Sequence, residues 1–296
     1  MTEFERLLMH MQTSQQIELF LKKPHHFLLL AGPTGSGKLT IGLLVGSKLL
    51  NFGSYQDIHK YPFFDHIVRP HDKKEISIDA VRDLTAKLRL RTTGRSPVRR
   101  IILIENAQHL SEEAQNALLK TLEEPPADSI FIFTVDSLSN LLPTIVSRAR
   151  IIDVQPTNPE AAENFFNTKF DSRKIDNAWQ LSRGRVGLMH ALLDDGQQHE
   201  LKQAIDHAKL FLAQAKYERL LDKSTLAQNR EKLGLLLDAL QIVIQALQKL
   251  TVQKRKKVNP TKFIKSLQLI QKLKMSLDAN ANSRLIYLTL CLDLEL

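Results

Sequence analysis

The sequence of 296 residues contains a single cysteine, Cys291. One cysteine excludes an intrachain disulfide and any zinc site built from a cluster of cysteines. The chain also has no apolar run near the roughly 18 residues that a membrane span requires. Its first residues, "MTEFERLLMHMQTSQQ", lack the charged-then-apolar pattern of a secretory signal. We therefore expect a cytoplasmic protein.

The charge balance is basic, with 41 Lys and Arg against 32 Asp and Glu, which gives a net charge of +9. An excess of this sign is compatible with a polyanionic partner such as DNA. Aromatic residues do not alternate with the basic ones, so stacking on bases is not expected, and each run by itself is typical of a solvated face. The basic runs comprise Arg82, Lys87, Arg89, Arg91, Arg95, Arg99, Arg100 and Lys254–Lys257.

The first half of the chain alternates strand and helix patterns. Short apolar runs occur in "HHFLLLAG", "FFDHIVRP", "RRIILIEN" and "SIFIFTVD". Helical spacing follows in "KLTIGLLVGSKLL", in "SIDAVRDLTAKLRL" from Ile78 or Asp79, and in "SEEAQNALLKTLEE" with Ser111 as N-cap. Apolar strands separated by helices predict a parallel sheet with helices on both faces.

The strand signals stop after about residue 153. "NPEAAENFFNTKF", "DNAWQLSRG" and "VGLMHALLDD" indicate a small helical unit, and the pattern from about residue 199 is almost entirely helical. Its apolar positions share one face, which suits a helical bundle or an oligomer interface. They are Leu233, Leu236, Leu237, Leu240, Ile244 and Leu247. We expect an α/β domain over 1–153, a helical lid over 154–198 and an all-α domain over 199–296.

The stretch "LLLAGPTGSGKLT" predicts a phosphate-binding loop between a strand and a helix. Gly32, Gly35 and Gly37 allow backbone amides to surround a phosphate, the helix N-terminus adds partial positive charge, and Lys38 can reach the terminal phosphates. These residues form the candidate nucleotide-binding set together with Thr40 and Glu105, and the family resemblance described below adds Thr134.

The loop departs from the usual pattern at the position after the lysine. A Ser or Thr there places a hydroxyl on Mg²⁺, but this chain has Leu39. Thr40 comes one residue later, about 100° further around the helix. Nucleotide binding stays open at this stage, and placement of a metal ion is impaired.

The stretch "RIILIENAQHL" predicts a buried strand that ends at Glu105 and Asn106. ATP hydrolysis at such a strand end needs one acid to support Mg²⁺ and a second to activate water. Two interpretations of Glu105 are open: it partly replaces the first acid, with its carboxylate displaced by an extra methylene, or it is a polar residue at the strand end with no metal role. Asn106 cannot act as a base, and loss of a general base typically costs about 10²–10⁴ in rate.

Four further stretches carry a family resemblance, namely "NALLKTLEEPP", "LLPTIVSRAR", "LSRGRVGLMHALL" and "LDANANSRLIYLTLCL". They resemble the bacterial clamp-loader branch of the AAA+ ATPases. The resemblance implies an α/β P-loop AAA+ domain with a parallel sheet, a helical lid and an all-α collar that joins subunits. Within that branch, the degenerate acids are similar to those of the delta-prime class of DNA polymerase III subunits, rather than of the ATP-hydrolysing tau/gamma class.

The resemblance also implies roles for individual residues. Thr134 lies near the first sensor position, with Val135 as an alternative register. Ser147 and Arg148 match a Ser-Arg-Cys motif, with Ala149 in place of its cysteine. In the family, that arginine projects toward the nucleotide of a neighbouring subunit, so Arg148 is the candidate arginine finger.

Two family features are absent from the sequence. The second sensor arginine is replaced by Leu188 in "GRVGLM". The four-cysteine zinc module between the phosphate loop and the second strand is also missing, because "NFGSYQDIHKYPFFDHIVRP" has no cysteine. His59 and His66 are too few to hold a metal, so no zinc is expected.

The combined pattern favours a non-hydrolysing structural subunit of a clamp loader that assists a neighbouring ATPase. Expected partners are tau/gamma and delta subunits, the sliding clamp indirectly, and primer-template DNA through weak contacts. No cofactor is required, and binding of ATP or ADP without hydrolysis stays open. The alternatives are an active ATPase of the tau/gamma type, with Thr40 and Glu105 in altered positions, and an AAA+-derived adaptor outside replication.

Overall fold

The computed structural model describes residues 7–70, 73–90, 92–93, 96–194, 200–221, 229–253, 260–279 and 281–295. The chain divides into two compact units. The first comprises Met1–Ala162 and Arg185–Gly187, and the second comprises Glu163–Gly184 and Leu188–Leu296. The three-domain division expected from the sequence stays a prediction.

The first unit is built on a five-stranded parallel sheet with the order β2-β3-β4-β1-β5. Four strands coincide with the predicted apolar runs, and β5 adds a fifth. The parallel sheet predicted from the sequence is therefore confirmed. The strands are β1 (Phe27–Ala31), β2 (Phe64–Ile67), β3 (Arg100–Ile104), β4 (Ser129–Val135) and β5 (Arg150–Asp153).

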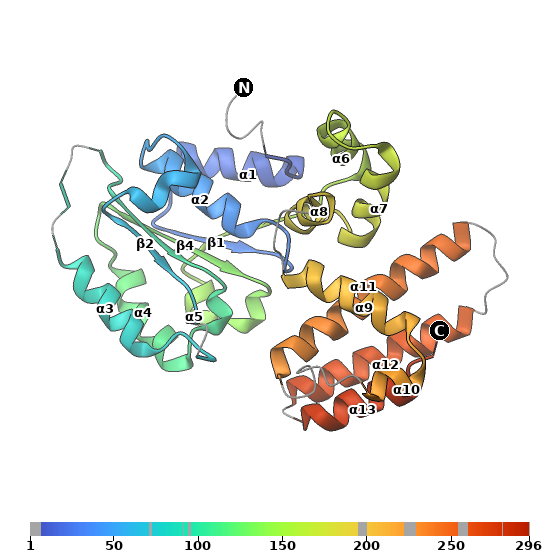
Figure 1. Cartoon of the computed structure of the whole chain (residues 1–296). Helices are drawn as coiled ribbons and strands as arrows, with labels where there is room; N and C mark the ends of the chain where they lie inside the picture. The colour runs from blue at the N-terminus through green and yellow to red at the C-terminus, as the bar shows by residue number, and fades with distance from the viewer. Residues whose placement is uncertain are drawn as a thin grey trace. The chain divides into compact units, whose positions relative to one another are not determined.

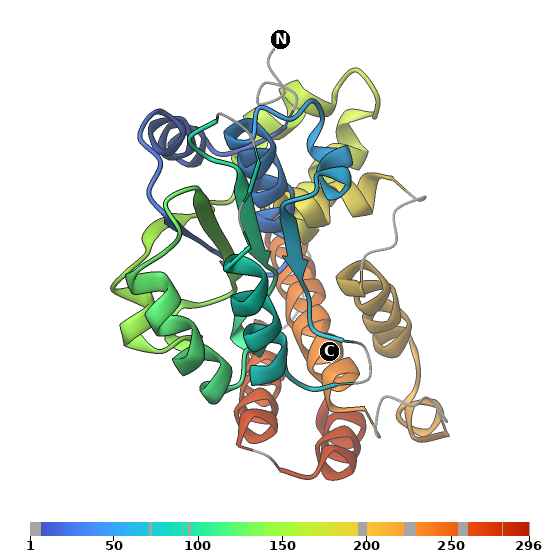
Figure 2. The ribbon, with the colours of Figure 1, turned by 90° about the vertical axis from the view of Figure 1, so that its left-hand side faces the viewer.

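Helices cover both faces of this sheet (Figures 1 and 2). One face packs against α1 (Met11–Lys22), α2 (Lys38–Leu49) and the short helix η1 (Tyr55–Lys60). The other packs against α3 (Ile78–Leu88), α4 (Glu112–Glu123) and α5 (Pro143–Val146). Two further short helices, η2 (Ala107–His109) and η3 (Leu138–Asn140), follow β3 and β4. β1, β3 and β4 are buried along their whole length, as expected for parallel strands covered on both sides.

Two helix starts predicted from the sequence are confirmed. α3 begins at Ile78 after Ser77. Ser111 is the N-cap of α4, and its hydroxyl accepts a hydrogen bond from the Ala114 amide at 3.2 Å. Glu113 lies in the first turn of α4, where hydrogen bonds from its own backbone amide and from Ser111 lower the pKa of its carboxyl.

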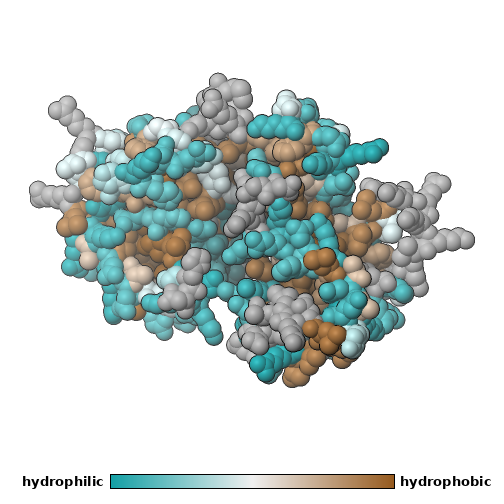
Figure 3. Space-filling view, in the orientation of Figure 1, coloured by the Kyte–Doolittle hydropathy of each residue, from teal (hydrophilic) through white to brown (hydrophobic). Residues whose placement is uncertain are grey.

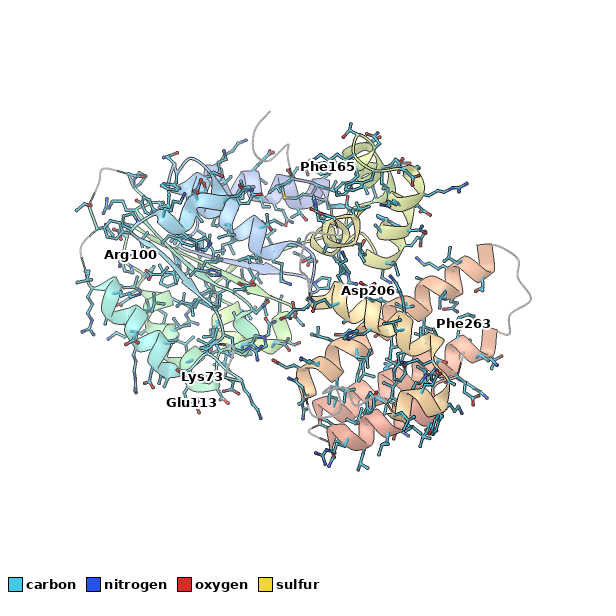
Figure 4. The ribbon with its side chains drawn as sticks, in the orientation of Figure 1. Lys73, Arg100, Glu113, Phe165, Asp206 and Phe263 are labelled. Carbon is cyan, nitrogen blue, oxygen red and sulfur yellow. The ribbon has the colours of Figure 1, made fainter. Side chains whose placement is uncertain are left out.

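The second unit is helical and has its own core (Figure 1). The long helix α11 packs against α7, α9, α12 and α13, and α13 also packs against α10. Figure 4 labels Phe263 of α12, which lies in this core. The helices from α6 on are α6 (Pro159–Phe166), α7 (Ser172–Ser182), α8 (Val186–Leu193), α9 (Glu200–Ala213), α10 (Lys216–Leu221), α11 (Arg230–Gln253), α12 (Pro260–Asp278) and α13 (Ser283–Asp293).

α11 has the apolar face predicted from the sequence, from Leu233 to Ile244, and these leucines and isoleucine are buried. Leu247 is an exception, because it is 39% exposed. The stripe leaves the core near the last turns of the helix. By length and composition, the stretch Arg230–Thr251 is the one candidate membrane span among the described residues. Half of its apolar window is buried inside the protein, as in the core helix of a helical bundle.

Candidate functional site

The phosphate loop lies between β1 and α2, where the sequence predicts it. Gly37 is the N-cap of α2 with φ 93°, and Gly35 has φ 84°, so both occupy backbone conformations that favour glycine. Gly32 is required for a different reason. A Cβ atom at this position would lie 3.0 Å from the Val154 carbonyl oxygen.

Lys38 is buried in this loop and points back into it. Its Nζ donates to Asp136 Oδ1 at 2.8 Å, to the Pro33 carbonyl at 3.2 Å and to the Gly32 carbonyl. Asp136 follows directly after β4, the strand next to β1. Sequence reasoning missed Asp136. The available signal was a carboxylate at the end of a buried strand, at the edge of the sheet where the loop lies.

The position after Lys38 has no polar role in the structure. Leu39 packs against the apolar core between α1, α2 and the sheet. Thr40 is half-buried one residue further along α2. The hydroxyl that would hold Mg²⁺ is therefore replaced by a side chain that stabilises the core.

Glu105 is directed away from the phosphate loop. Its Oε2 lies 3.2 Å from Nε2 of His66, which belongs to β2. In the sheet, β2 lies on one side of β3, whereas β4 and the loop-bearing β1 lie on the other. Glu105 thus faces the strand on the side of β3 opposite to the phosphate loop.

Asn106 makes the turn at the end of β3. Its φ of 52° is left-handed, a conformation in which asparagine is several-fold enriched. Its backbone amide donates to Thr134 Oγ1 at 2.8 Å. Asn106 and Thr134 together fasten the end of β3 to β4.

The two candidate registers of the first sensor lie on opposite faces of the sheet. Thr134 is buried and follows Ile130 and Ile132, which pack toward α2. Val135 is buried in the other core, against α3 to α5. Thr134 therefore lies on the face of the sheet that is covered by α2, the helix that carries Lys38. Its hydroxyl already accepts a hydrogen bond from the Asn106 backbone amide.

Leu188, at the position where the resemblance predicts the second sensor arginine, is completely buried in the core of the helical unit. It is a packing residue. Among the described residues, no group of three or more His, Cys, Asp or Glu side chains lies where it could hold a metal ion. The rings of His59 and His66 are 5.3 Å apart, and His66 also faces Glu105. Taken together, these side chains do not fit a hydrolytic Mg²⁺–nucleotide site.

Arg148 follows α5 and lies at the surface with a third of its side chain exposed. Its guanidinium donates to the Thr144 carbonyl at 2.7 Å and pairs with Glu123 at the end of α4. The Ser147 hydroxyl donates to the same Thr144 carbonyl at 3.1 Å. Ser147 thus supports the turn that presents Arg148.

Gln115 of α4 fixes the approach to α5 from the interior. Its amide nitrogen donates to the Leu110 carbonyl at 3.2 Å, and its amide oxygen accepts from the Leu142 amide at 2.9 Å. The side chain is buried. Since α5 begins at Pro143, this bridge helps to set the position of the turn that ends at Arg148.

The first basic run does not form one continuous cationic face. Arg100, labelled in Figure 4, is buried over the Phe63 ring and donates to the Leu90 carbonyl at 2.8 Å. Arg99 pairs with Asp128, and Lys87 with Asp65. Arg91, Arg95 and Lys254–Lys257 lie outside the described residues. DNA contact by these runs stays a prediction.

Comparison with known proteins identifies the family. Residues 9–158 match the model of the family described as "DNA polymerase III, delta subunit", which is half of the chain. The chain belongs to this DNA polymerase III subunit family. The resemblance predicted from the sequence, to clamp-loader subunits of the delta-prime type, is confirmed at this level.

Two curated relatives are similar to this chain in sequence, and one solved structure is similar in fold. The delta-prime subunit of Haemophilus influenzae is 27% identical over 186 residues, 58% of this chain and 56% of the relative. The gamma subunit of Buchnera aphidicola is 27% identical over 252 residues, 77% of this chain and 68% of the relative. A gamma-subunit-related protein of Thermotoga maritima has a TM-score of 0.54 at 17% identity, covering 95% and 97% of the two chains.

The Thermotoga structure confirms the fold class, a parallel α/β domain followed by a helical part. This chain spans a little over half of the Haemophilus delta-prime relative. Membership of the DNA polymerase III family does not by itself separate a delta-prime role from a gamma role, because both kinds of subunit match.

Proposed function

We propose that this chain is a non-hydrolysing structural subunit of a DNA polymerase III clamp loader, of the delta-prime type. It assists the loading of the sliding clamp onto primed DNA and supplies Arg148 to the nucleotide site of a neighbouring ATPase subunit. The observation that carries the proposal is the contrast between two places in the first unit. The chain's own hydrolytic groups are missing or turned away, whereas Arg148 remains at the surface.

Three side chains at the positions expected to hold hydrolytic groups support the first half of this proposal. Leu39 packs into the core, Glu105 faces His66, and Leu188 is buried among apolar helices. A hydrolytic site would need a hydroxyl, a carboxylate and an arginine at these three places. The hydroxyl and the arginine are replaced by leucines, and the carboxylate of Glu105 faces His66 instead of the phosphate loop.

The contacts of Arg148 support the second half. Its guanidinium is held in the free chain by Glu123, whose side chain is about half exposed. An exposed ion pair of this kind contributes only about 0–1 kcal/mol. The Arg148 guanidinium therefore loses little free energy when it leaves Glu123 for a more strongly charged phosphate. An arginine supplied by a neighbouring subunit can raise the rate of phosphoryl transfer by about 10³–10⁵.

The partners of the proposed subunit are tau/gamma and delta subunits, with the sliding clamp as an indirect partner. Contact with primer-template DNA is expected to be weak and limited to phosphates, since the basic residues are interleaved with acidic partners. We place the subunit in the cytoplasm together with the replication machinery. An ATPase role of the tau/gamma type is the second candidate, because the Buchnera gamma subunit matches the larger share of this chain.

Turnover by the purified chain separates the two candidates. We expect negligible ATP hydrolysis, with or without primed DNA, because the Mg²⁺-holding hydroxyl and the catalytic acid are absent. The measurement is phosphate release at saturating Mg²⁺–ATP. Turnover of about 1 s⁻¹ or faster that disappears in Lys38→Ala would establish the ATPase role instead.

A further inference from the structure

The phosphate loop already holds an anion, which is a carboxylate of its own chain. A lysine ammonium has three N–H donors and no acceptor. In Lys38 these donors are directed at Asp136, the Pro33 carbonyl and the Gly32 carbonyl. Only 6% of the Lys38 side chain is exposed. The lysine has no donor left for a nucleotide unless one of these contacts breaks.

Asp136 is engaged through both of its oxygens. Oδ1 accepts from Lys38 at 2.8 Å, while Oδ2 accepts from Thr34 Oγ1 at 3.0 Å and from Gln108 Nε2 at 3.1 Å. Thr34 belongs to the phosphate loop, and Gln108 belongs to η2, after β3. One carboxylate therefore joins the loop to the ends of β3 and β4.

A second segment of the same unit, Arg185–Gly187, packs against the loop although it is distant from it in the sequence. Arg185 donates to the Thr34 carbonyl at 3.2 Å. A Cβ atom on Gly187 would lie 2.9 Å from the Gly35 carbonyl oxygen and 3.3 Å from the Gly37 amide nitrogen. The backbone at Gly187 therefore lies directly against the loop, and this close approach requires glycine.

We infer that Asp136 is an internal ligand of the phosphate loop, which takes the place of a nucleotide phosphate as the counter-ion of Lys38. The loop is then a structural contact that folds without nucleotide, and Asp136 competes with a nucleotide phosphate for Lys38. This inference goes beyond the proposed function. It concerns the isolated chain, and it gives a physical reason for a loop that keeps its lysine after losing its metal-binding hydroxyl.

A double-mutant cycle on the isolated chain tests this contact. Lys38→Met and Asp136→Asn are made singly and together, and unfolding in urea is followed by circular dichroism. We expect each single change to lower the urea midpoint and the double change to lower it by less than the sum, because either one breaks the same contact. The control pair is Lys60→Met with Asp57→Asn, an exposed ion pair in η1 that should give additive effects.

Nucleotide titration provides the second readout. We expect fluorescent ADP and Mg²⁺–ATP at millimolar concentration to leave the thermal midpoint of the wild-type chain unchanged. Asp136→Asn should bind ADP at least about tenfold more tightly than wild type, a gain of about 1.4 kcal/mol, and Lys38→Met should abolish the gain. Additive effects in the cycle, or wild-type binding of ADP that Asp136→Asn leaves unimproved, would overturn the inference. Both readouts use the chain alone, so a failure of the Arg148 role in a complex would leave them unchanged.

Discussion

At the scale of one residue, Asn106 stands where the sequence comparison expects a catalytic acid, and its backbone makes a turn there. The residue turns the chain at the end of β3 with φ 52°, and its amide is held by Thr134. Asparagine tolerates this conformation better than most residues that carry a Cβ. The position where the sequence comparison expects a general base is here a turn residue, held through its backbone amide.

His190 provides a prediction at the same scale. Burial lowers the pKa of His190 below its ordinary value of 6.5, and repulsion from Lys169 adds to the effect. Its ring packs against Phe166 at 4.8 Å and Phe165 at 6.1 Å; Figure 4 labels Phe165. The folded protein thus keeps the ring neutral under conditions where the unfolded chain takes up a proton.

The pH dependence of stability that His190 causes follows from proton linkage. Below about pH 6.5 the unfolded state binds more protons than the folded state. The contribution of His190 to the free energy of unfolding is therefore complete above that pH and decreases as the pH drops toward the lowered pKa. We expect His190→Phe to flatten this fall, measured by urea unfolding between pH 7.5 and 5. His207→Gln, on the exposed face of α9, is the control. If the free energy of unfolding of His190→Phe depends on pH as strongly as that of the wild type, His190 does not cause this pH dependence.

At the scale of an element, α13 is apolar on two opposite sides. Ile286, Tyr287, Leu290 and Cys291 lie in the core of the helical unit. The opposite side carries a stripe of leucines with helical spacing that is 44–64% exposed, and apolar surface gathers over α13 in Figure 3. The stripe consists of Leu285, Leu288 and Leu292.

We predict that this stripe contributes to subunit assembly. Burial of one leucine side chain is worth roughly 1.5–3 kcal/mol, so changing all three to serine should weaken association with tau/gamma and delta subunits by at least about 100-fold. The fold should persist, because none of the three lies in the core. Size-exclusion chromatography of the mixed subunits measures association, with Leu19→Ser of α1 as the control. Association at wild-type affinity would place the contact elsewhere.

At the scale of the whole molecule, the sheet and its helices could be predicted because buried parallel strands are continuous apolar runs. β5 escaped prediction, since its four residues include exposed Arg150 and Asp153. The loop position of Lys38 could also be read from spacing. Its pairing with Asp136 could not, because that contact depends on β4 lying next to β1, a matter of strand order rather than of local pattern.

The direction of Glu105 has the same origin. Whether it faces the phosphate loop or His66 depends on which strand lies on each side of β3. The pairing of Arg148 with Glu123 joins residues 25 positions apart, from the ends of two helices. Sequence patterns predicted Lys38, Glu105 and Arg148, whereas Asp136 and the other partners of these residues could be found only from the assembled structure.

Arg148 is proposed to act on a neighbouring subunit rather than on its own chain. The most direct measurement is DNA-stimulated ATP turnover of a complex reconstituted with tau/gamma and delta subunits, in which only this chain carries Arg148→Ala. Assembly, checked by size-exclusion chromatography, and the fold of the chain should be unchanged. The site that Arg148 serves should lose about 10³ or more in rate, so that total turnover falls by the share of that site.

Arg148→Lys should be impaired as well, because an ammonium does not reproduce the planar guanidinium fork. Arg173→Ala, which removes an exposed arginine of α7, should leave turnover at the wild-type rate. Wild-type turnover and clamp loading in a correctly assembled Arg148→Ala complex would contradict the account and leave this chain a scaffold only.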